Sequence, residues 1–341
     1  MADHNPIYHL KDSYYFEVPK ALWKRDWKTL EDVPNFLRGA HPDATLEQFN
    51  EAMDGKILIP QPFGTLESLY TVKSGFGISK YMILEVVLAA ILVFVFTRLA
   101  TSLRNGEPAR GRFENLFEAM ILFVRDQIAR PAIDSHDHHD HAHEHSGHGV
   151  EHGHESHAVT SAPKHDGDTF VPLLLTLFFF VLGCNLFGMV PWAGSPTASF
   201  SVTLALAGVT FLTVVAAGMQ KFGVIGFFTN QVPSMDLPLP LTILLTPMIF
   251  AIEMLGLCIK HLILAVRLLA NMVAGHLVLL GIMGLISAAA TYSMGLWATV
   301  TGISVVSCTL FSVLELFVAF LQADIFTFLS ALFIGAAVHQ H

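Results

Sequence analysis

The fold of this chain is decided by residues 241–286, which read LTILLTPMIFAIEMLGLCIKHLILAVRLLANMVAGHLVLLGIMGLI. Glu253, Lys260 and Arg267 are the only formal charges in this stretch. A second long apolar stretch, Leu296–Val338, lies near the C-terminus. At 1.5 Å per residue, each exceeds a perpendicular membrane crossing by roughly a factor of two. We therefore expect each to be steeply tilted, broken or a pair of spans, and we predict a C-terminal hairpin of two long tilted helices.

The composition is typical of a polytopic membrane protein. Of the 341 residues, 53% are hydrophobic and only 14% are charged, a balance unlike that of a soluble domain. Three further apolar segments, Tyr81–Leu103, Phe170–Val190 and Thr197–Met219, are each long enough to cross a bilayer as one helix. With the C-terminal hairpin they predict an all-α membrane protein with about five crossings. The net charge of −9 argues against nucleic-acid binding.

Arginines gather after the first predicted span, at Arg104, Arg110, Arg112, Arg125 and Arg130. Among them, Phe113–Ile128 carries apolar residues at helical spacing with charges between them. This pattern predicts one interfacial amphipathic helix that lies on the membrane. The concentration of arginine puts this face in the cytoplasm. With five crossings, the N-terminus then lies outside and the C-terminus is cytoplasmic.

The predicted domain organisation follows from these segments. Residues 1–78 are polar and form a non-cytoplasmic N-terminal extension, in which Leu46–Met53 is expected as a short amphipathic helix. The predicted parts that follow are the first transmembrane helix with the cytoplasmic amphipathic helix (79–133), a His-rich disordered loop (134–168), a transmembrane hairpin (169–222) and the long tilted hairpin (223–341).

Residues 134–165 hold 11 of the chain's 18 histidines, which alternate with Asp and Glu in the tract His136–His157. No hydrophobic periodicity supports a fold there, so we expect a disordered loop. Imidazoles and carboxylates bind Zn²⁺ or Ni²⁺ loosely, which leaves metal buffering or pH sensing as one interpretation. A tolerated insertion in an exposed loop is the interpretation that we favour. The tract defines no specific metal site.

Arg267 is the most informative single residue. Its guanidinium stays protonated at every biological pH, and holding it at membrane depth costs about 3 kcal/mol on insertion scales and roughly 10–17 kcal/mol in simulations. The alternative is an arginine near a helix end that reaches back to the interface. The sixteen uncharged residues 268–283 that follow Arg267 argue against it. We therefore expect a fixed positive charge that faces a path for ions.

Other polar residues of the first long stretch share one face with Arg267. On a helix at about 100° per residue, Lys260 falls at about 20° from Arg267, and Asn271 and Glu253 each fall at about 40°. His276 falls at about 180° and therefore serves the opposite side of the helix.

The second long stretch also carries polar residues in a pattern. Glu315 and Gln322 are seven residues apart, two turns along one face, whereas Asp324 points about 160° away from Gln322. His276 and Glu315 can accept and pass protons, whereas an arginine can only repel cations or attract a carboxylate. A proton path with an electrostatic barrier requires this division of labour.

At these residues the chain resembles a known family. The run LAVRLLANMVAGH, residues 264–276, resembles the signature of subunit a of F-type ATP synthases, approximately L-x-x-R-L-x-x-N-x-x-A-G-[EH]. The segment Glu315–Phe328, with LQA at 321–323, resembles the family's second signature, and NLFGMVP at 185–191 resembles its N-L-x-x-x-x-P stretch. The resemblance covers about residues 80–338, in the same order and spacing.

The resemblance implies a role for each matching residue. Arg267 matches the essential stator arginine, which faces the carboxylate of each passing c-ring subunit. Gln322 matches the glutamine beside that arginine across the helix hairpin. The residues that match polar positions lining two aqueous half-channels are Asn271, Glu253 and Lys260.

Two positions of the proton path differ from the pattern of many bacterial members. Where those members have Glu, this chain has His276, and where they have His, it has Glu315, as in mitochondrial-type members. This exchange implies that one acid and one imidazole are needed near each other. Asp324 stands where an aromatic residue is usual, and we include it in the proton path as an open assignment.

The resemblance also implies partners and a location. The partners are the c-ring subunits, the b-subunit peripheral stalk, the remaining F-type ATP synthase and the lipid bilayer. The chain then sits in a bacterial plasma (inner) membrane, carries protons without a cofactor and catalyses no bond chemistry itself. The sequence does not decide between H⁺ and Na⁺, because the coupling-ion site of this family lies mostly on the c subunit.

Two other classes of function compete with this interpretation. The His-rich cytoplasmic loop is a feature of many zinc transporters. An intramembrane metal site, however, needs paired ligands at i and i+4, where His276 has Leu280 and His261 has Ala265. A membrane assembly factor without transport gives no reason for the polar residues within apolar helices.

Overall fold

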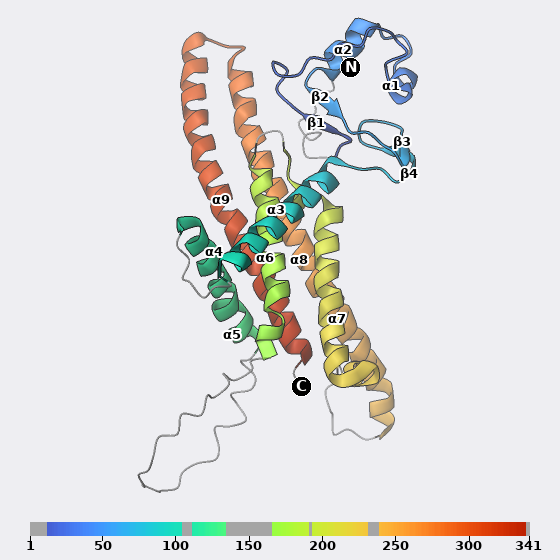
Figure 1. Cartoon of the computed structure of the whole chain (residues 1–341), viewed down its shortest axis with the longest axis vertical. Coiled ribbons are helices and arrows are strands. Elements are labelled where there is room, and N and C mark those ends of the chain that lie inside the picture. The colour runs from blue at the N-terminus through green and yellow to red at the C-terminus, as the bar shows by residue number, and fades with distance from the viewer. Residues whose placement is uncertain (1–11, 104–110, 134–165, 191–192, 231–238, 339–341) are drawn as a thin grey trace. The chain divides into compact units, whose positions relative to one another are not determined.

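The structure is a computed structural model that describes residues 12–103, 111–133, 166–190, 193–230 and 239–338 (Figure 1). The predicted His-rich loop falls almost entirely on residues 134–165, which lie outside the described residues.

The N-terminal region is a small folded module. Its elements are β1 (Tyr15–Glu17), α1 (Asn35–Ala40), α2 (Leu46–Met53), β2 (Lys56–Leu58), β3 (Gly64–Leu66) and β4 (Val72–Gly75). β1 pairs with β2 and β3 pairs with β4, both antiparallel. The amphipathic helix predicted at 46–53 is confirmed with the same bounds. Thr45 and Gln48 form a capping box at its start, and Phe49 and Met53 are buried.

The rest of the described chain is helical. Its elements are α3 (Lys80–Leu103), α4 (Arg112–Phe123), the π-helical turn η2 (Val124–Ala129), α5 (Arg130–Ile133), the 3₁₀ turns η4 (Asp166–Thr169) and η5 (Pro196–Ala198), α6 (Val171–Gly188), α7 (Phe200–Asn230), α8 (Leu239–Ala289) and α9 (Met294–Val338). Helices α3, α6, α7, α8 and α9 are each long and apolar enough to cross a membrane. This confirms the predicted class, an all-α membrane protein with five candidate crossings. Each long C-terminal stretch is one helix, not a pair of spans.

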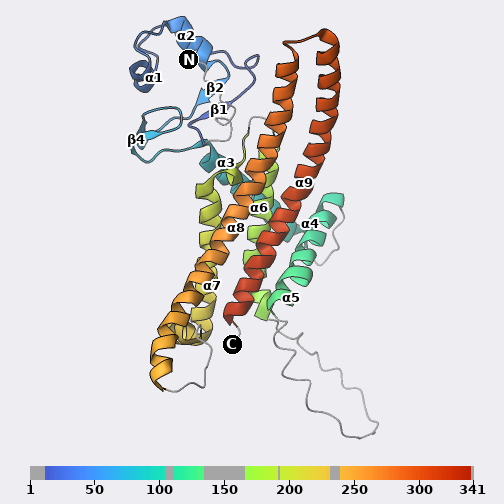
Figure 2. The ribbon, with the colours of Figure 1, turned by 180° about the vertical axis from the view of Figure 1, so that it is seen from behind.

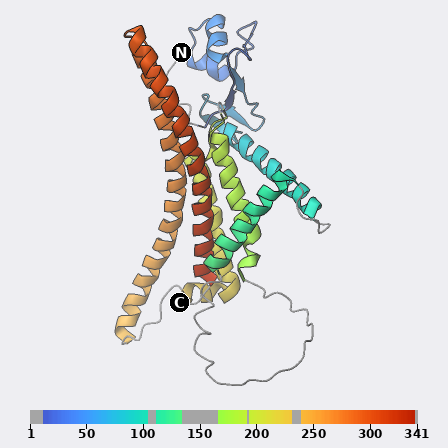
Figure 3. The same ribbon diagram turned by 90° about the vertical axis from the view of Figure 1, so that its left-hand side faces the viewer.

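Packing divides the chain into two compact units. The first consists of residues 1–97, 180–206 and 265–322, and the second consists of residues 98–179, 207–264 and 323–341. Both long C-terminal helices therefore contribute one segment to each unit. In the first unit, the segments 265–289 of α8 and 294–322 of α9 lie side by side and run in opposite directions (Figures 2 and 3). We call these two segments the polar hairpin.

In the first unit, α6 packs closely against α3. A Cβ placed on Gly183 would come within 2.5 Å of Leu88 Cδ1, so a larger residue would force the Leu88 side chain to shift. The end of the N-terminal module is joined to the start of α3 by backbone contacts. Lys80 N–H donates to the Ser13 carbonyl at 2.9 Å, and the Tyr81 ring next to it is buried.

In the second unit, the predicted amphipathic helix contains a π-helical turn and continues beyond its predicted end, to Ile133. The sequence predicted one helix at 113–128, but α4 ends at Phe123 and the chain continues through η2 into α5. Arg130 holds this turn, since its guanidinium binds both carboxylate oxygens of Asp168, at 3.0 and 3.1 Å, and also Asp126. The hydrogen bond from Arg125 lowers the pKa of the Asp126 carboxyl. The predicted position of α4 on the membrane surface stays a prediction.

Helix α7 is longer than the predicted span 197–219 and contains a sharp bend. Gly223 has φ +75° and ψ 168°, outside the helical region, a conformation that glycine adopts at little cost. The chain after this bend folds back, so that a Cβ on Gly218 would lie 2.4 Å from the Phe227 ring.

Candidate functional site

Arg267 lies on α8 in the polar hairpin. Its side chain is partly exposed, and it makes no ion pair or hydrogen bond within the part of the chain that the structure describes. An unpaired guanidinium on an apolar helix is costly in a membrane. Arg267 thus presents a fixed positive charge, and the described residues do not use its N–H donors.

A pair of amides joins the two helices one turn beyond the arginine. Asn271 Nδ2 donates to Gln322 Oε1 at 2.5 Å. Gln322 is buried, with 2% of its surface exposed, and its Nε2 group has no hydrogen-bond acceptor among the described residues. A buried amide donor without a partner is costly. Gln322 therefore keeps an unused donor inside the hairpin.

The imidazole and the acid come together farther along the same hairpin. His276 Nδ1 lies 3.5 Å from Glu315 Oε1, and the side chains are 16% and 9% exposed. Within the part of the chain that the structure describes, Glu315 Oε1 makes no hydrogen bond of good geometry, so this contact is loose compared with the amide pair. Gly275 makes room for the acid, because a Cβ there would come within 2.8 Å of Glu315 Oε1.

Asn185, from the third motif, holds α9 in place. It is completely buried, and its Nδ2 group donates to the Ala319 carbonyl at 3.3 Å, one turn before Gln322. Its Oδ1 atom accepts from Thr197 Oγ1 at 2.8 Å. The sequence singled out this motif but assigned it no contact. Its amide positions the helix that carries Gln322 and Glu315.

Three of the predicted site residues lie in the second unit. Glu253 and Lys260 are exposed on α8, and Asp324 on α9 is partly exposed. None of the three makes an ion pair or hydrogen bond with another described residue. Their roles in the proton path stay predictions.

His261 is a buried polar residue that the sequence considered only as a metal ligand. It is 3% exposed, and its Nδ1 atom lies 2.9 Å from the Leu257 carbonyl of its own helix. Its ring contacts Phe211 and Phe333, with ring centroids 5.3 and 4.9 Å apart. Helical phase alone does not separate such a packed imidazole from one beside water.

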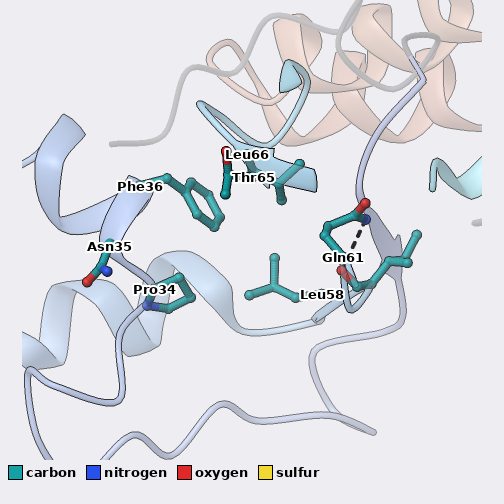
Figure 4. Close-up of a pocket in the computed structure, with 8 residues that line it drawn as sticks. Pro34, Asn35, Phe36, Leu58, Gln61, Thr65 and Leu66 are labelled. Carbon is teal, nitrogen blue, oxygen red and sulfur yellow. Dashed lines mark hydrogen bonds between the residues drawn. The ribbon is translucent and has the colours of Figure 1, made fainter. Parts of the chain in front are cut away.

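The N-terminal module contains an apolar pocket of about 310 Å³ between α1 and the strands β2 and β3 (Figure 4). Its lining residues are Pro34, Asn35, Phe36, Leu58, Ile59, Gln61, Thr65 and Leu66. None of these side chains titrates, so the pocket has no group that could relay a proton.

Within the described residues, five long apolar helices and an arginine without an ion pair, beside buried polar pairs, are the features of a membrane protein of the ion-translocating class. A family described as "ATP synthase A chain" matches residues 153–335. The chain belongs to this family, the a subunits of ATP synthases.

Relatives in bacteria share the similarity over most of the chain. An ATP synthase subunit a from Anaeromyxobacter sp. (strain Fw109-5) is 32% identical over 98% of this chain and 70% of that protein. The subunit a of Chloroherpeton thalassium is 34% identical over 87% of this chain and 78% of its own length. An ATP synthase subunit a 2 from Chlorobium luteolum is 33% identical over 81% of this chain and 71% of its own length. The chain is a membrane protein of ATP synthesis and proton transport, and none of these relatives is a zinc transporter.

Proposed function

We propose that this chain forms two proton half-channels against a rotating c-ring, with Arg267 between them. A proton enters one half-channel and neutralises a c-ring carboxylate, which then rotates into lipid. After nearly a full turn the proton leaves through the other half-channel. Arg267 favours the ionised carboxylate when it returns, and its charge blocks direct passage of protons from one half-channel to the other.

The observation that carries this proposal is the state of Arg267 in the polar hairpin. Its guanidinium is partly exposed and makes no ion pair or hydrogen bond among the described residues. A carboxylate from a partner subunit would satisfy these donors and offset the cost of the charge. The c-ring supplies such a carboxylate repeatedly.

The remaining polar residues have different roles in the proposed proton path. The amide pair Asn271 and Gln322 keeps an unused donor near the arginine's helix face. His276 and Glu315 form a titratable pair that relays protons in one half-channel. Glu253, Lys260 and, as an open assignment, Asp324 line the aqueous parts of the path. The chain itself makes and breaks no covalent bond, and it needs no cofactor for this role.

The assembly and its orientation are part of the same proposal. The chain contacts the c-ring and the b-subunit peripheral stalk in a bacterial plasma membrane. Its N-terminal module lies outside and its C-terminus lies in the cytoplasm, because the arginines between the first two spans favour the cytoplasmic side.

The test is the substitution Arg267→Lys in the assembled complex. Lysine carries a deprotonatable point charge and lacks the planar fork of donors. We expect loss of both ATP-driven proton pumping and proton-driven ATP synthesis, measured in vesicles. Arg112→Lys is the matched control, because Arg112 is exposed on α4 and outside the hairpin. Near-normal coupled synthesis in Arg267→Lys would overturn the proposal.

A further inference from the structure

The N-terminal module carries two exposed aromatic side chains close to the first membrane helix. Phe63 is 71% exposed and Phe76 is 59% exposed. Phe76 N–H donates to the Phe63 carbonyl at 3.1 Å, so the two residues are neighbours at the open end of the β3–β4 hairpin. Large apolar side chains that are this exposed favour removal from water.

The backbone is built to hold the two residues together. Gly75 has φ +83°, and a Cβ there would lie 2.2 Å from the Phe63 carbonyl oxygen. Only glycine fits this conformation and this close approach. The Gln61 side chain adds a second tie, since its Nε2 donates to the Ile78 carbonyl at 2.9 Å and its Oε1 accepts from Ile78 N–H at 2.7 Å. The aromatic pair is therefore fixed to the short segment that joins β4 to α3.

Its distance from the membrane helix is limited by the chain. Phe76 precedes Lys80, the first residue of α3, by four residues, so their Cα atoms are at most about 14 Å apart. Two hydrogen bonds fix the module at this end: Lys80 N–H donates to Ser13 O at 2.9 Å, and Tyr81 N–H donates to Asp12 Oδ1 at 3.4 Å. The module therefore does not hang from a free linker.

The length of α3 locates this end in the bilayer. The apolar span Lys80–Thr101 has 22 residues, about 33 Å as a helix, which is close to the roughly 30 Å of hydrocarbon that it must cross. Lys80 consequently lies near the edge of the hydrocarbon, and the headgroup layer extends about 5–8 Å beyond it. Phe63 and Phe76 lie within reach of this layer.

We propose that Phe63 and Phe76 form a lipid-contact site that seats the N-terminal module in the headgroup layer of the bilayer. The partner is the lipid surface itself, because the site is continuous with the end of a membrane-spanning helix. Phenylalanine is one of the apolar residues that surface-bound segments bury at the boundary between headgroups and acyl chains. The proposal depends on α3 crossing the membrane and not on the path of protons.

The proposal is tested with a fluorescent label in the assembled complex, reconstituted in vesicles. Cysteine is introduced at Phe63, at Phe76 or, as a matched control, at Glu47, in a complex free of other reactive cysteines. Glu47 is exposed on α2, which both views show farther from α3 than β3 and β4 (Figures 1 and 3). Each cysteine carries an NBD group, which is quenched either by nitroxide lipids or by aqueous iodide.

We expect labels at 63 and 76 to be quenched by nitroxide lipids and to be several-fold less sensitive to iodide than the label at 47. Equal quenching by iodide at all three positions would show that the module stands free in water. Protection from both quenchers at 63 and 76 would show that a protein covers the site, and would also overturn the proposal.

If replacing either phenylalanine with cysteine disturbs folding, a third position can be labelled instead. Ser74, exposed on β4 two residues before Phe76, accepts a cysteine label without loss of an aromatic side chain. ATP-driven pumping by each labelled complex checks assembly. The label at Ser74 should show the same preference for lipid quenching over iodide quenching as the label at Phe76.

Discussion

Polar side chains of α8 and α9 contact each other across the two helices in the first unit, but not among the described residues of the second unit. In the polar hairpin of the first unit, contacts cross from one helix to the other: Asn271 binds Gln322 and His276 meets Glu315. Thr299, Thr309 and Ser312 of this unit bond to their own backbone. In the second unit, the polar side chains of the same helices that have a partner among the described residues also bond to their own backbone. These bonds join His261 to the Leu257 carbonyl, Thr327 to the Ala323 carbonyl and Ser330 to the Phe326 carbonyl, each four residues back.

The difference teaches how to interpret a polar residue in an apolar helix. A side chain that bonds four residues back satisfies itself wherever the helix lies, so it reports little about function. A pair that crosses helices persists only at one spacing and register of the two helices. The cross-helix pairs are therefore where a change of geometry or protonation can alter transport.

The largest effect is expected at the titratable pair. His276→Ala and Glu315→Ala should each slow passive proton flow by about 100-fold, the lower end of what a placed acid or base contributes. The double variant should be no slower than the poorer single variant, because interacting residues are not additive. Proton flow into vesicles that contain the membrane sector measures this.

The exchanged variant His276→Glu with Glu315→His tests whether the two residues act as a pair. It should retain more proton flow than either single exchange, since it restores one acid and one imidazole at the same contact. Strictly additive losses without recovery on exchange would show that the two residues act independently.

A smaller effect is expected from crowding the same contact. Gly275→Ala places a Cβ within 2.8 Å of Glu315 Oε1, and overpacking of this kind costs about 1–3 kcal/mol. We expect a several-fold loss of proton flow with normal assembly. Gly281→Ala is the matched control on the same helix, because nothing lies within 4 Å of its Cβ position. Equal rates in both variants would mean that the acid does not need its present position.

Whether an element could be predicted from the sequence depends on how many residues its sequence signal covers. Local periodicity gave the bounds of helix 46–53, and length gave the five long helices. The bend at Gly223 was not predicted, because a glycine in an apolar run does not reveal which backbone conformation it takes. The two short sheets of the N-terminal module were also missed, since strands of three or four residues are too short for alternation to show.

Helical phase predicted the face of each polar residue but not its contacts, whereas the exchange of His276 and Glu315 relative to many family members predicted that these two lie near each other, as they do at 3.5 Å. Helical phase placed Asn271 on the side of Arg267, yet it gave no means of finding Gln322 as the partner that accepts its hydrogen bond. The packing of His261 between Phe211 and Phe333 was not predicted, for the same reason. A cross-helix contact depends on the separation and register of two helices, which one sequence does not specify.

Little effect on transport is expected from His261→Phe in the second unit. Phenylalanine keeps the ring contacts with Phe211 and Phe333 and removes the buried Nε2 atom, which has no hydrogen-bond partner among the described residues. Proton flow should stay close to normal and thermal stability of the complex should be equal or higher. A large loss of flow with intact assembly would place His261 in the proton path and remove the contrast between the units.

The smallest effect is expected from deleting residues 137–157. They belong to the His-rich tract, which shows no apolar periodicity in sequence. Assembly and coupled ATP synthesis should be unchanged at about pH 7.5 without added metal, where imidazoles are mostly neutral. If the purified deletion complex lost passive proton flow, the tract would have a role beyond that of an insertion.

The hydrogen bond from Asn185 to α9 has a consequence for how this chain can vary. Its acceptor is the main-chain carbonyl of Ala319, not a side chain. Every amino acid supplies that carbonyl, so the hydrogen bond itself does not limit position 319, whereas complete burial limits the position to small apolar side chains. The side chain at position 319 can therefore vary in evolution within this limit, while the hydrogen bond from Asn185 continues to position the part of α9 that carries Gln322.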